Sequence, residues 1–167
     1  MSLIMEKNIV KLFEKVQKIP YKVCKFERDK IDENILYGDC RHKSELLYKL
    51  LAKAGFEVKR LKVVFYWKDL PLPNKLLAII GHDSIWDHDS LSVKINGRWT
   101  MVDCTWNSEL KKKGFPVTEK WDGKSDTKLV TEGKLEFYDA DKYIKKFKIE
   151  KDSALRFADE LNKWLSS

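Results

Sequence analysis

The sequence contains few cysteines and lacks any long apolar run. Its three cysteines cannot all pair with one another, and no segment of the secretory type opens the chain. The longest apolar run, Leu76 to Ile80, is far too short to span a bilayer. These absences favour a protein of the reducing cytoplasm that has no membrane partner.

Repeats, linkers and shifts of composition are missing as well. A chain of 167 residues, 43% of them hydrophobic, can form a substantial core, so we expect a single domain over residues 1–167. Residues 1–4 resemble an expression scar ahead of a native Met5, and no fold prediction is based on them.

The chain is basic, with a formal charge of +7 and a pI of about 9.2. Such a charge permits attraction to nucleic acids or acidic substrates. However, the basic side chains are mostly lysines interleaved with acidic residues, and no arginine-aromatic motif of an RNA-binding module is present. We therefore favour a solvated surface and keep a nucleic-acid-binding module as a less favoured alternative.

The stretch 37–55 places a cysteine where a helix is predicted to begin. Its apolar residues have the spacing of an amphipathic helix and are Leu46, Leu47, Leu50, Leu51 and Ala54. Asp39 is a suitable N-cap, Gly38 allows a sharp turn before it, and Gly55 is a natural left-handed stop. The pattern predicts a helix from about Cys40 to Ala54.

In the first turn of a helix, a cysteine meets unpaired backbone N–H groups and the positive end of the helix dipole. Both favour thiolate over thiol, and the same amides can hold an oxyanion. Cys40 is therefore a candidate nucleophile. The alternative is that Cys40 is a small buried hydrophobic residue, which is the commonest role of a lone cysteine.

Two alternating runs within residues 88–106 are separated by Asn96-Gly97, the strongest short signal for a β-hairpin. If these two residues form the turn, Ile95 lies opposite Arg98 and the rest of the register follows.

In this register His88 shares a sheet face with Asp103, and their backbones lie roughly 7 Å apart, within reach of an imidazole and a carboxylate. The opposite face is apolar and carries Leu91, Val93, Ile95, Val102 and Cys104. The His-Asp face also carries Ser90, Ser92, Trp99 and Met101. The hairpin thus predicts a His-Asp pair beside a mixed surface of the kind that borders a cleft.

Several short motifs occur together in one order: Gly38-Asp39-Cys40 at a helix start, Ala54-Gly55-Phe56 at its end, His88 on a strand, Gly97-Arg98-Trp99, and Val102-Asp103-Cys104-Thr105. Over about residues 36–106 this pattern resembles the transglutaminase-like superfamily of papain-like cysteine enzymes. Two positions depart from that family, since Asp89 stands where an aromatic residue often follows the histidine, and Cys104 where proline commonly follows the aspartate.

The resemblance implies an α+β, papain-like domain in which an antiparallel sheet packs against the helix carrying the cysteine. It implies that Cys40 is the nucleophile, His88 the general base and Asp103 the residue that orients the histidine. The expected reaction is cofactor-free acyl transfer through a thioester, on a peptide, protein or small amide. Within this class we favour a protease or amidase over a cross-linking enzyme.

Three aromatic residues are candidate cleft or oxyanion contacts: Tyr37, Trp86 and Trp99. For Trp86, a position in the core is an equal alternative. Besides the nucleic-acid-binding module, one competing function remains open, a catalytically silent member of the family that binds a peptide or protein partner. A metal site is also considered, with Cys40, His42, His82 and His88 as potential ligands. The paired spacing of a zinc site is missing, so we expect no metal.

The flanking segments are predicted as follows. Before the hairpin we expect a packing helix over 5–19, an irregular segment over 21–35, a strand from 56–58 to 67 and an irregular connection over 68–87. After the hairpin we expect a lid or binding loop over 107–133, a possible strand over 135–138, and a terminal helix capped by Asp152 or Ser153.

Overall fold

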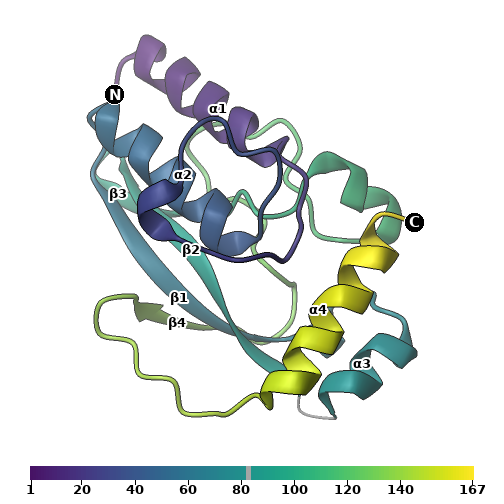
Figure 1. Cartoon of the computed structure of the whole chain (residues 1–167). Helices are drawn as coiled ribbons and strands as arrows, with labels where there is room; N and C mark the ends of the chain where they lie inside the picture. Colours follow the sequence, from purple (N-terminus) through teal and green to yellow (C-terminus); the bar gives the residue numbers. More distant parts are fainter. Residues whose placement is uncertain (82–83) are drawn as a thin grey trace.

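The computed structural model of the protein describes residues 1–81 and 84–167. Its α-helices are α1 (Leu3–Gln17), α2 (Cys40–Lys53), α3 (Asn74–Ile80) and α4 (Lys151–Leu165). Its strands are β1 (Val58–Tyr66), β2 (Ile85–Ile95), β3 (Arg98–Val102) and β4 (Glu136–Asp139). Short 3₁₀ turns are η1 (Arg28–Lys30), η2 (Trp67–Asp69) and η3 (Ser108–Lys113). The architecture is α+β, with an antiparallel sheet packed against helices (Figure 1).

The four strands of the sheet lie in the order β3-β2-β1-β4, and all neighbours are antiparallel. In the β2–β3 hairpin, Ile95 lies opposite Arg98 and Leu91 opposite Val102, which confirms the predicted register. Asn96 and Gly97 both have positive φ angles, of 51° and 78°, as a two-residue type I′ turn requires. Thus the Asn-Gly dipeptide sets the register of the strand that carries His88.

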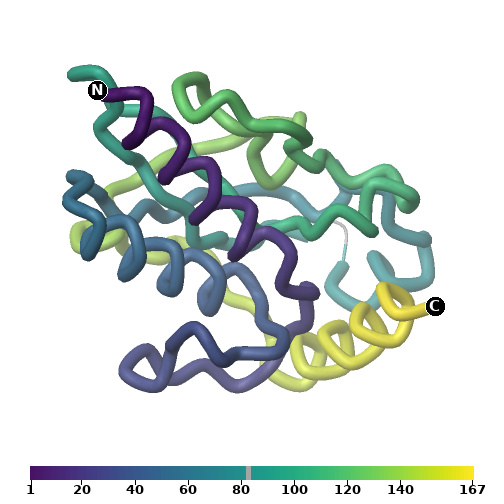
Figure 2. Tube along the Cα trace, turned by 90° about the horizontal axis from the view of Figure 1, so that it is seen from above, coloured from purple at the N-terminus to yellow at the C-terminus, as the bar shows by residue number. Residues whose placement is uncertain are grey.

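Helices α1 and α2 run side by side over one face of the sheet (Figures 1 and 2). Their apolar faces join the apolar face of the hairpin in one core, which includes Phe13, Leu47, Leu51, Val93 and Cys104. The α2 helix begins at Cys40 after an Asp39 N-cap, and Gly55 follows it with φ of 91°, as predicted. Gly38 also leaves space for a neighbour, because a Cβ at this position would come within 2.5 Å of His42 Cβ.

A second core lies between the sheet, α3, α4 and the segment that follows Trp106. It is rich in aromatic residues, including Phe65, Trp67, Trp106, Phe115 and Phe157. Phe115, Val117 and Trp121 are buried, so they anchor the 107–133 segment to the body of the protein. Thr127 bonds to the Met101 carbonyl through its N–H, which places this segment along the outer edge of β3. These contacts place the predicted lid or binding loop along the edge of the sheet, with its apolar residues packed in the core.

Two expectations about the elements were wrong, and one helix is longer at its start than the predicted range. The connection over 68–87 contains α3, whose N-cap is Pro73, and β2 begins at Ile85. The cap of α4 is Glu150, whose carboxylate accepts from the N–H groups of Asp152 and Ser153. Helix α1 begins at Leu3, inside the four residues that carried no prediction.

Within the described part of the chain, no helix combines the length and the hydrophobicity needed to cross a membrane.

Candidate active site

Cys40 is the first helical residue of α2 and lines a cavity of about 560 Å³. Its side chain is half-buried, so a small reagent can reach it from the cavity. Within residues 1–81 and 84–167, no group accepts a hydrogen bond from the Cys40 backbone N–H. This free amide at a helix N-terminus can stabilise negative charge on the sulfur or on a nearby oxygen.

His88, on β2, and Asp103, directly after β3, form a buried pair. The His88 Nε2 atom lies 2.6 Å from Asp103 Oδ2, and the other Asp103 oxygen accepts from the backbone N–H of Thr105 at 3.0 Å. Because an ionised carboxylate can only accept, Nε2 of His88 carries the proton. The Nδ1 atom is then the nitrogen available to Cys40.

The ionisable groups of this site influence one another. Burial of the His88 imidazole disfavours its charged form, but the Asp103 carboxylate and Cys40 outweigh this effect and hold the pKa of His88 well above its usual value. Burial raises the pKa of the Cys40 thiol, and the charge of His88 and a side-chain hydrogen bond to it partly offset the rise. For Asp103, burial would raise the pKa, yet His88 keeps it below its usual value. The imidazole is therefore coupled to both the thiol and the carboxylate.

Contacts from distant segments hold this geometry in place. The backbone N–H of Asp103 donates to Thr127 Oγ1 at 2.8 Å, so the 107–133 segment fixes the end of β3. One turn into α2, Lys43 is fully buried and donates to the carbonyls of Gln17, Ile19 and Thr105 at 2.7–3.0 Å. Burial lowers the pKa of Lys43 to about 8, which still leaves it largely charged at neutral pH. Lys43 therefore connects the Cys40 helix to the loop that carries Asp103.

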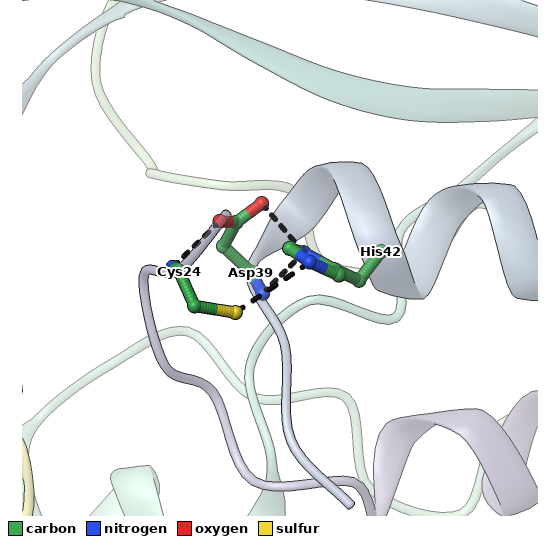
Figure 3. Close-up of side chains that lie close together, drawn as sticks. All are labelled: Cys24, Asp39 and His42. Atoms are coloured by element: carbon green, nitrogen blue, oxygen red, sulfur yellow. Dashed lines mark hydrogen bonds and ion pairs between the residues drawn. The ribbon is translucent and has the colours of Figure 1, made fainter. Parts of the chain in front are cut away.

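Close to Cys40, a second group of potential metal ligands contains Cys24, Asp39 and His42 (Figure 3). Their donor atoms lie within 4.8 Å of one another, but other groups already occupy them. His42 Nδ1 accepts from the Asp39 N–H at 3.2 Å, and its Nε2 lies 2.9 Å from the carbonyl oxygen of Lys25. The Asp39 carboxylate binds Arg41 through both oxygens. The group is best explained as a helix cap.

The four ligands considered for a metal site on sequence grounds do not form a group in the described part of the chain. His42 belongs to the cap, His88 to the pair with Asp103, and His82 lies outside the described residues.

Of the three candidate aromatic contacts, Trp86 alone lines the Cys40 cavity. Trp86 also packs on the second core, so it both lines the cavity and contributes to the core. Tyr37 lines a separate cavity of about 740 Å³, and Lys22 lies 4.5 Å from the centre of its ring. Trp99 lies on β3 with Lys59 4.0 Å from its ring centre. Tyr37 and Trp99 therefore do not reach the cavity in this structure.

Residues that sequence reasoning missed also line the cavity. Tyr21 is paired with Gly38 through an isolated bridge and lines both cavities. Burial, with a contribution from Cys40, holds the pKa of Tyr21 well above its usual value, so its hydroxyl remains a donor. Helix α4 contributes Ala154, Leu155 and Ala158. The apolar stripe of α4 was visible in the sequence, but its position opposite Cys40 was not.

The chain matches no protein-family model, no curated protein and no solved structure in the comparisons made. Fold and site geometry define an α+β protein with a four-stranded antiparallel sheet, in which a cysteine, a histidine and an aspartate lie close together.

Proposed function

We propose that the protein is a cysteine-dependent acyl-transfer enzyme of the transglutaminase-like, papain-like type. The observation that carries the proposal is the 2.6 Å contact between His88 and Asp103, together with the coupling of His88 to a cysteine at a helix N-terminus. A nucleophile, a base and a group that orients the base are the parts that such catalysis needs. The resemblance over residues 36–106 supports the same assignment.

In the proposed reaction, His88 holds the Cys40 proton on Nδ1, which its raised pKa favours, as the Cys40 sulfur forms a bond to the amide carbonyl carbon. The carbon–nitrogen bond then breaks, and the leaving amine takes the proton from His88, which leaves a thioester on Cys40. Water gives a proton to His88 as it attacks the thioester, and the carboxylic acid leaves as the thiol is restored. Asp103 keeps the proton of neutral His88 on Nε2 and stabilises the imidazolium.

The negatively charged oxygen of the intermediate needs hydrogen-bond donors. The unoccupied backbone N–H of Cys40 supplies one, as expected for a nucleophile in the first turn of a helix. For a second donor, the cavity lining supports Tyr21 better than Tyr37, because Tyr21 shares the cavity with Cys40. Peptides, proteins and small amides remain the proposed substrates, with hydrolysis favoured over cross-linking.

Acylation by p-nitrophenyl acetate tests this function without knowledge of the natural substrate. The sulfur of Cys40 forms a bond to the acetyl carbon, the ester carbon–oxygen bond breaks, and p-nitrophenolate leaves. We expect a burst of p-nitrophenolate and an acetyl group on Cys40 by peptide mass mapping. Cys40→Ala should abolish the burst, and His88→Ala should slow it on the order of a hundredfold or more. An acetyl group spread over all three cysteines, or a burst unaffected by His88→Ala, would contradict the proposal.

A catalytically silent domain that binds a peptide is the second candidate, and the raised pKa of the Cys40 thiol favours it. In that case Cys40→Ala would leave peptide binding unchanged and no burst would occur. The formal charge of +7 is the one observation that supports the alternative function of nucleic-acid binding. A mobility shift with an affinity that falls steeply with salt would support that function.

A further inference from the structure

One wall of the Cys40 cavity comes from helix α4, which lies outside the stretch of the family resemblance. Ala154, Leu155 and Ala158 of this helix line the cavity, and Phe157 lies buried beside them. Leu155 is 58% exposed although it faces a cavity next to a candidate nucleophile. An exposed leucine in this position would lose contact with water when a substrate group occupies the cavity.

A second apolar part of the lining is formed by aromatic rings that pack against one another. Trp86 packs against Phe157 with ring centres 5.9 Å apart, and Trp67 packs against the same ring at 5.1 Å. Val23 completes this side of the lining. Aromatic rings fixed by one another form a pre-organised surface, which costs little conformational entropy when a ligand binds.

The charged residues of the lining pair with acidic residues of the same lining. Lys62 Nζ lies 2.8 Å from Asp89, Lys145 Nζ lies 3.4 Å from Asp87, and Arg41 binds Asp39 at 2.6 Å. In the described part of the chain, Lys151 at the exposed start of α4 is the lining cation without an ion pair. Side chains that already pair with an opposite charge attract a charged ligand only weakly. The apolar part of the lining should therefore decide which ligand binds in the cavity.

A buried donor at the cavity lacks a partner. Trp67 lines the cavity and is 4% exposed, and no group among residues 1–81 and 84–167 accepts a hydrogen bond from its Nε1–H. Buried donors are nearly always satisfied in folded proteins, and Trp67 Nε1–H and the Tyr143 hydroxyl are the two exceptions in this part of the chain.

From these observations we infer that the cavity is the acyl-group pocket, and that the substrate carries an uncharged, apolar acyl group beside the bond that is cut. This inference rests on the proposed function, since it takes Cys40 as the acceptor of the acyl group. The apolar chain would lie between Trp86 and α4, and the carbonyl would lie at Cys40. Substrates with a charged acyl group would have to leave that charge against apolar side chains.

A series of p-nitrophenyl esters tests the pocket: the acetate, the hexanoate and the 6-trimethylammoniohexanoate. Each rate of Cys40 acylation is divided by the rate of the same ester with free N-acetylcysteine, which removes the intrinsic reactivity. We expect the corrected rate for hexanoate to exceed that for acetate by at least about tenfold, because each buried methylene adds a few-fold. The charged ester of the same length should lose most of this gain.

A substitution that fills the pocket provides the second arm. Ala158→Phe should lower the ratio of the hexanoate rate to the acetate rate by about tenfold, because the new ring occupies the space of the acyl chain. The matched control is Arg156→Phe, an exposed position on the same helix that does not line the cavity, and it should leave the ratio unchanged. Thermal melting of both variants shows whether each is folded.

The possible outcomes separate the two proposals. If no ester acylates Cys40, the proposed function fails and the inference fails with it. If acetate acylates Cys40 but hexanoate gains nothing, or Ala158→Phe leaves the ratio unchanged while folded, the inference alone is wrong. If the charged ester reacts as fast as hexanoate, the pocket does not select for apolar acyl groups.

Discussion

At the scale of single residues, the carboxylate of Asp103 serves two donors at once. One oxygen accepts from His88 Nε2 and the other from the backbone N–H of Thr105. An asparagine has only one acceptor oxygen, so Asp103→Asn cannot satisfy both. If its oxygen stays with the backbone of Thr105, its amide group faces His88 and draws the imidazole proton onto Nδ1.

That tautomer cannot take the Cys40 proton, so we expect Asp103→Asn to slow acylation of Cys40 by p-nitrophenyl acetate roughly 10³–10⁴-fold. The burst rate measures this loss, and thermal melting should show a protein that is still folded. Asp159→Asn, on the exposed side of α4, is the matched control and should react as the wild type. Equal rates for Asp103→Asn and wild type would overturn the role of Asp103.

The three cysteines should differ in their reaction with iodoacetamide. Burial raises the pKa of Cys40 above its usual value, and His88 offsets part of this rise. The labelling rate of Cys40 should therefore increase between pH 8 and 10, as more of the thiol becomes thiolate. Burial raises the pKa of Cys104 to about 12 and should keep it unlabelled. Peptide mass mapping over this pH range should show Cys40 labelled first, and His88→Ala should move its profile to higher pH and slow it several-fold.

Cys24 is the competitor that the sequence did not reveal. Its sulfur lies 3.5 Å from His42 Nε2, but His42 is held by Lys25 O and by the N–H of Asp39 and is not free to act as a base. Burial, with Asp39, raises the pKa of Cys24. Even labelling of Cys24 and Cys40, or a Cys40 profile indifferent to His88, would mean that Cys40 is structural.

At the scale of elements, the faces of the β2–β3 hairpin allow a direct test of the core. Val93 is completely buried in the cluster shared with α2, whereas Lys94 beside it is exposed. Val93→Asp would place an unpaired charge in this core and should cost more than about 4 kcal/mol, enough to unfold many proteins of this size. Thermal melting should show its loss of structure, and Lys94→Ala should melt close to the wild type. Unchanged melting of Val93→Asp would contradict the packing of the sheet.

The hairpin and α2 could be predicted because their signals are local. The Asn96-Gly97 turn sets the pairing of neighbouring residues, and the cap, apolar stripe and final glycine of α2 all lie within one short stretch. Helix α3 could not be predicted, because proline usually interrupts regular structure, whereas Pro73 stands at the start of this helix, where proline is tolerated. So short a helix depends on tertiary packing, here on α4, which no local pattern shows. The start of α4 was misplaced because glutamate is an uncommon N-cap, which made Asp152 and Ser153 better candidates than Glu150.

At the scale of the whole molecule, the candidate site is built from segments far apart in the chain. The spacing of residues within the hairpin predicted His88 and Asp103, and helix capping predicted Cys40. No local pattern could place Tyr21 or Leu155 at the same cavity, because their positions follow from how the N-terminal segment and α4 dock on the second core. The proximity of Cys40, His88 and Asp103 was therefore predictable from local patterns, while the other residues that line the Cys40 cavity were not.

The stability of the whole protein should depend on acid through Asp39. Burial alone would raise the pKa of this carboxylate, but hydrogen bonds to Arg41 and His42 outweigh it, and the pKa lies well below its usual value. The unfolded chain, with an aspartate pKa of about 3.9, therefore binds more protons in acid than the folded protein does. The stabilisation by Asp39 is present above about pH 4 and is lost as the pH falls toward the folded pKa. The pairing of His88 with Asp103 acts in the opposite sense, because it raises the pKa of His88 against the effect of burial. This stabilisation is fully present below about pH 6.5 and is lost as the pH rises through the folded pKa.

Urea unfolding at pH 7, 5 and 3 measures the effect of acid. We expect the free energy of unfolding of the wild type to fall between pH 5 and 3. Asp39→Asn keeps a good N-cap but loses the charged hydrogen bonds to Arg41, so it should be less stable than the wild type by about 2 kcal/mol at pH 7, and this difference should shrink toward pH 3. Glu33→Gln, which removes the exposed partner of Lys15, is the control and should follow the wild type at each pH. A constant difference between Asp39→Asn and wild type from pH 7 to pH 3 would show that the charge of Asp39 is not what holds the start of the Cys40 helix.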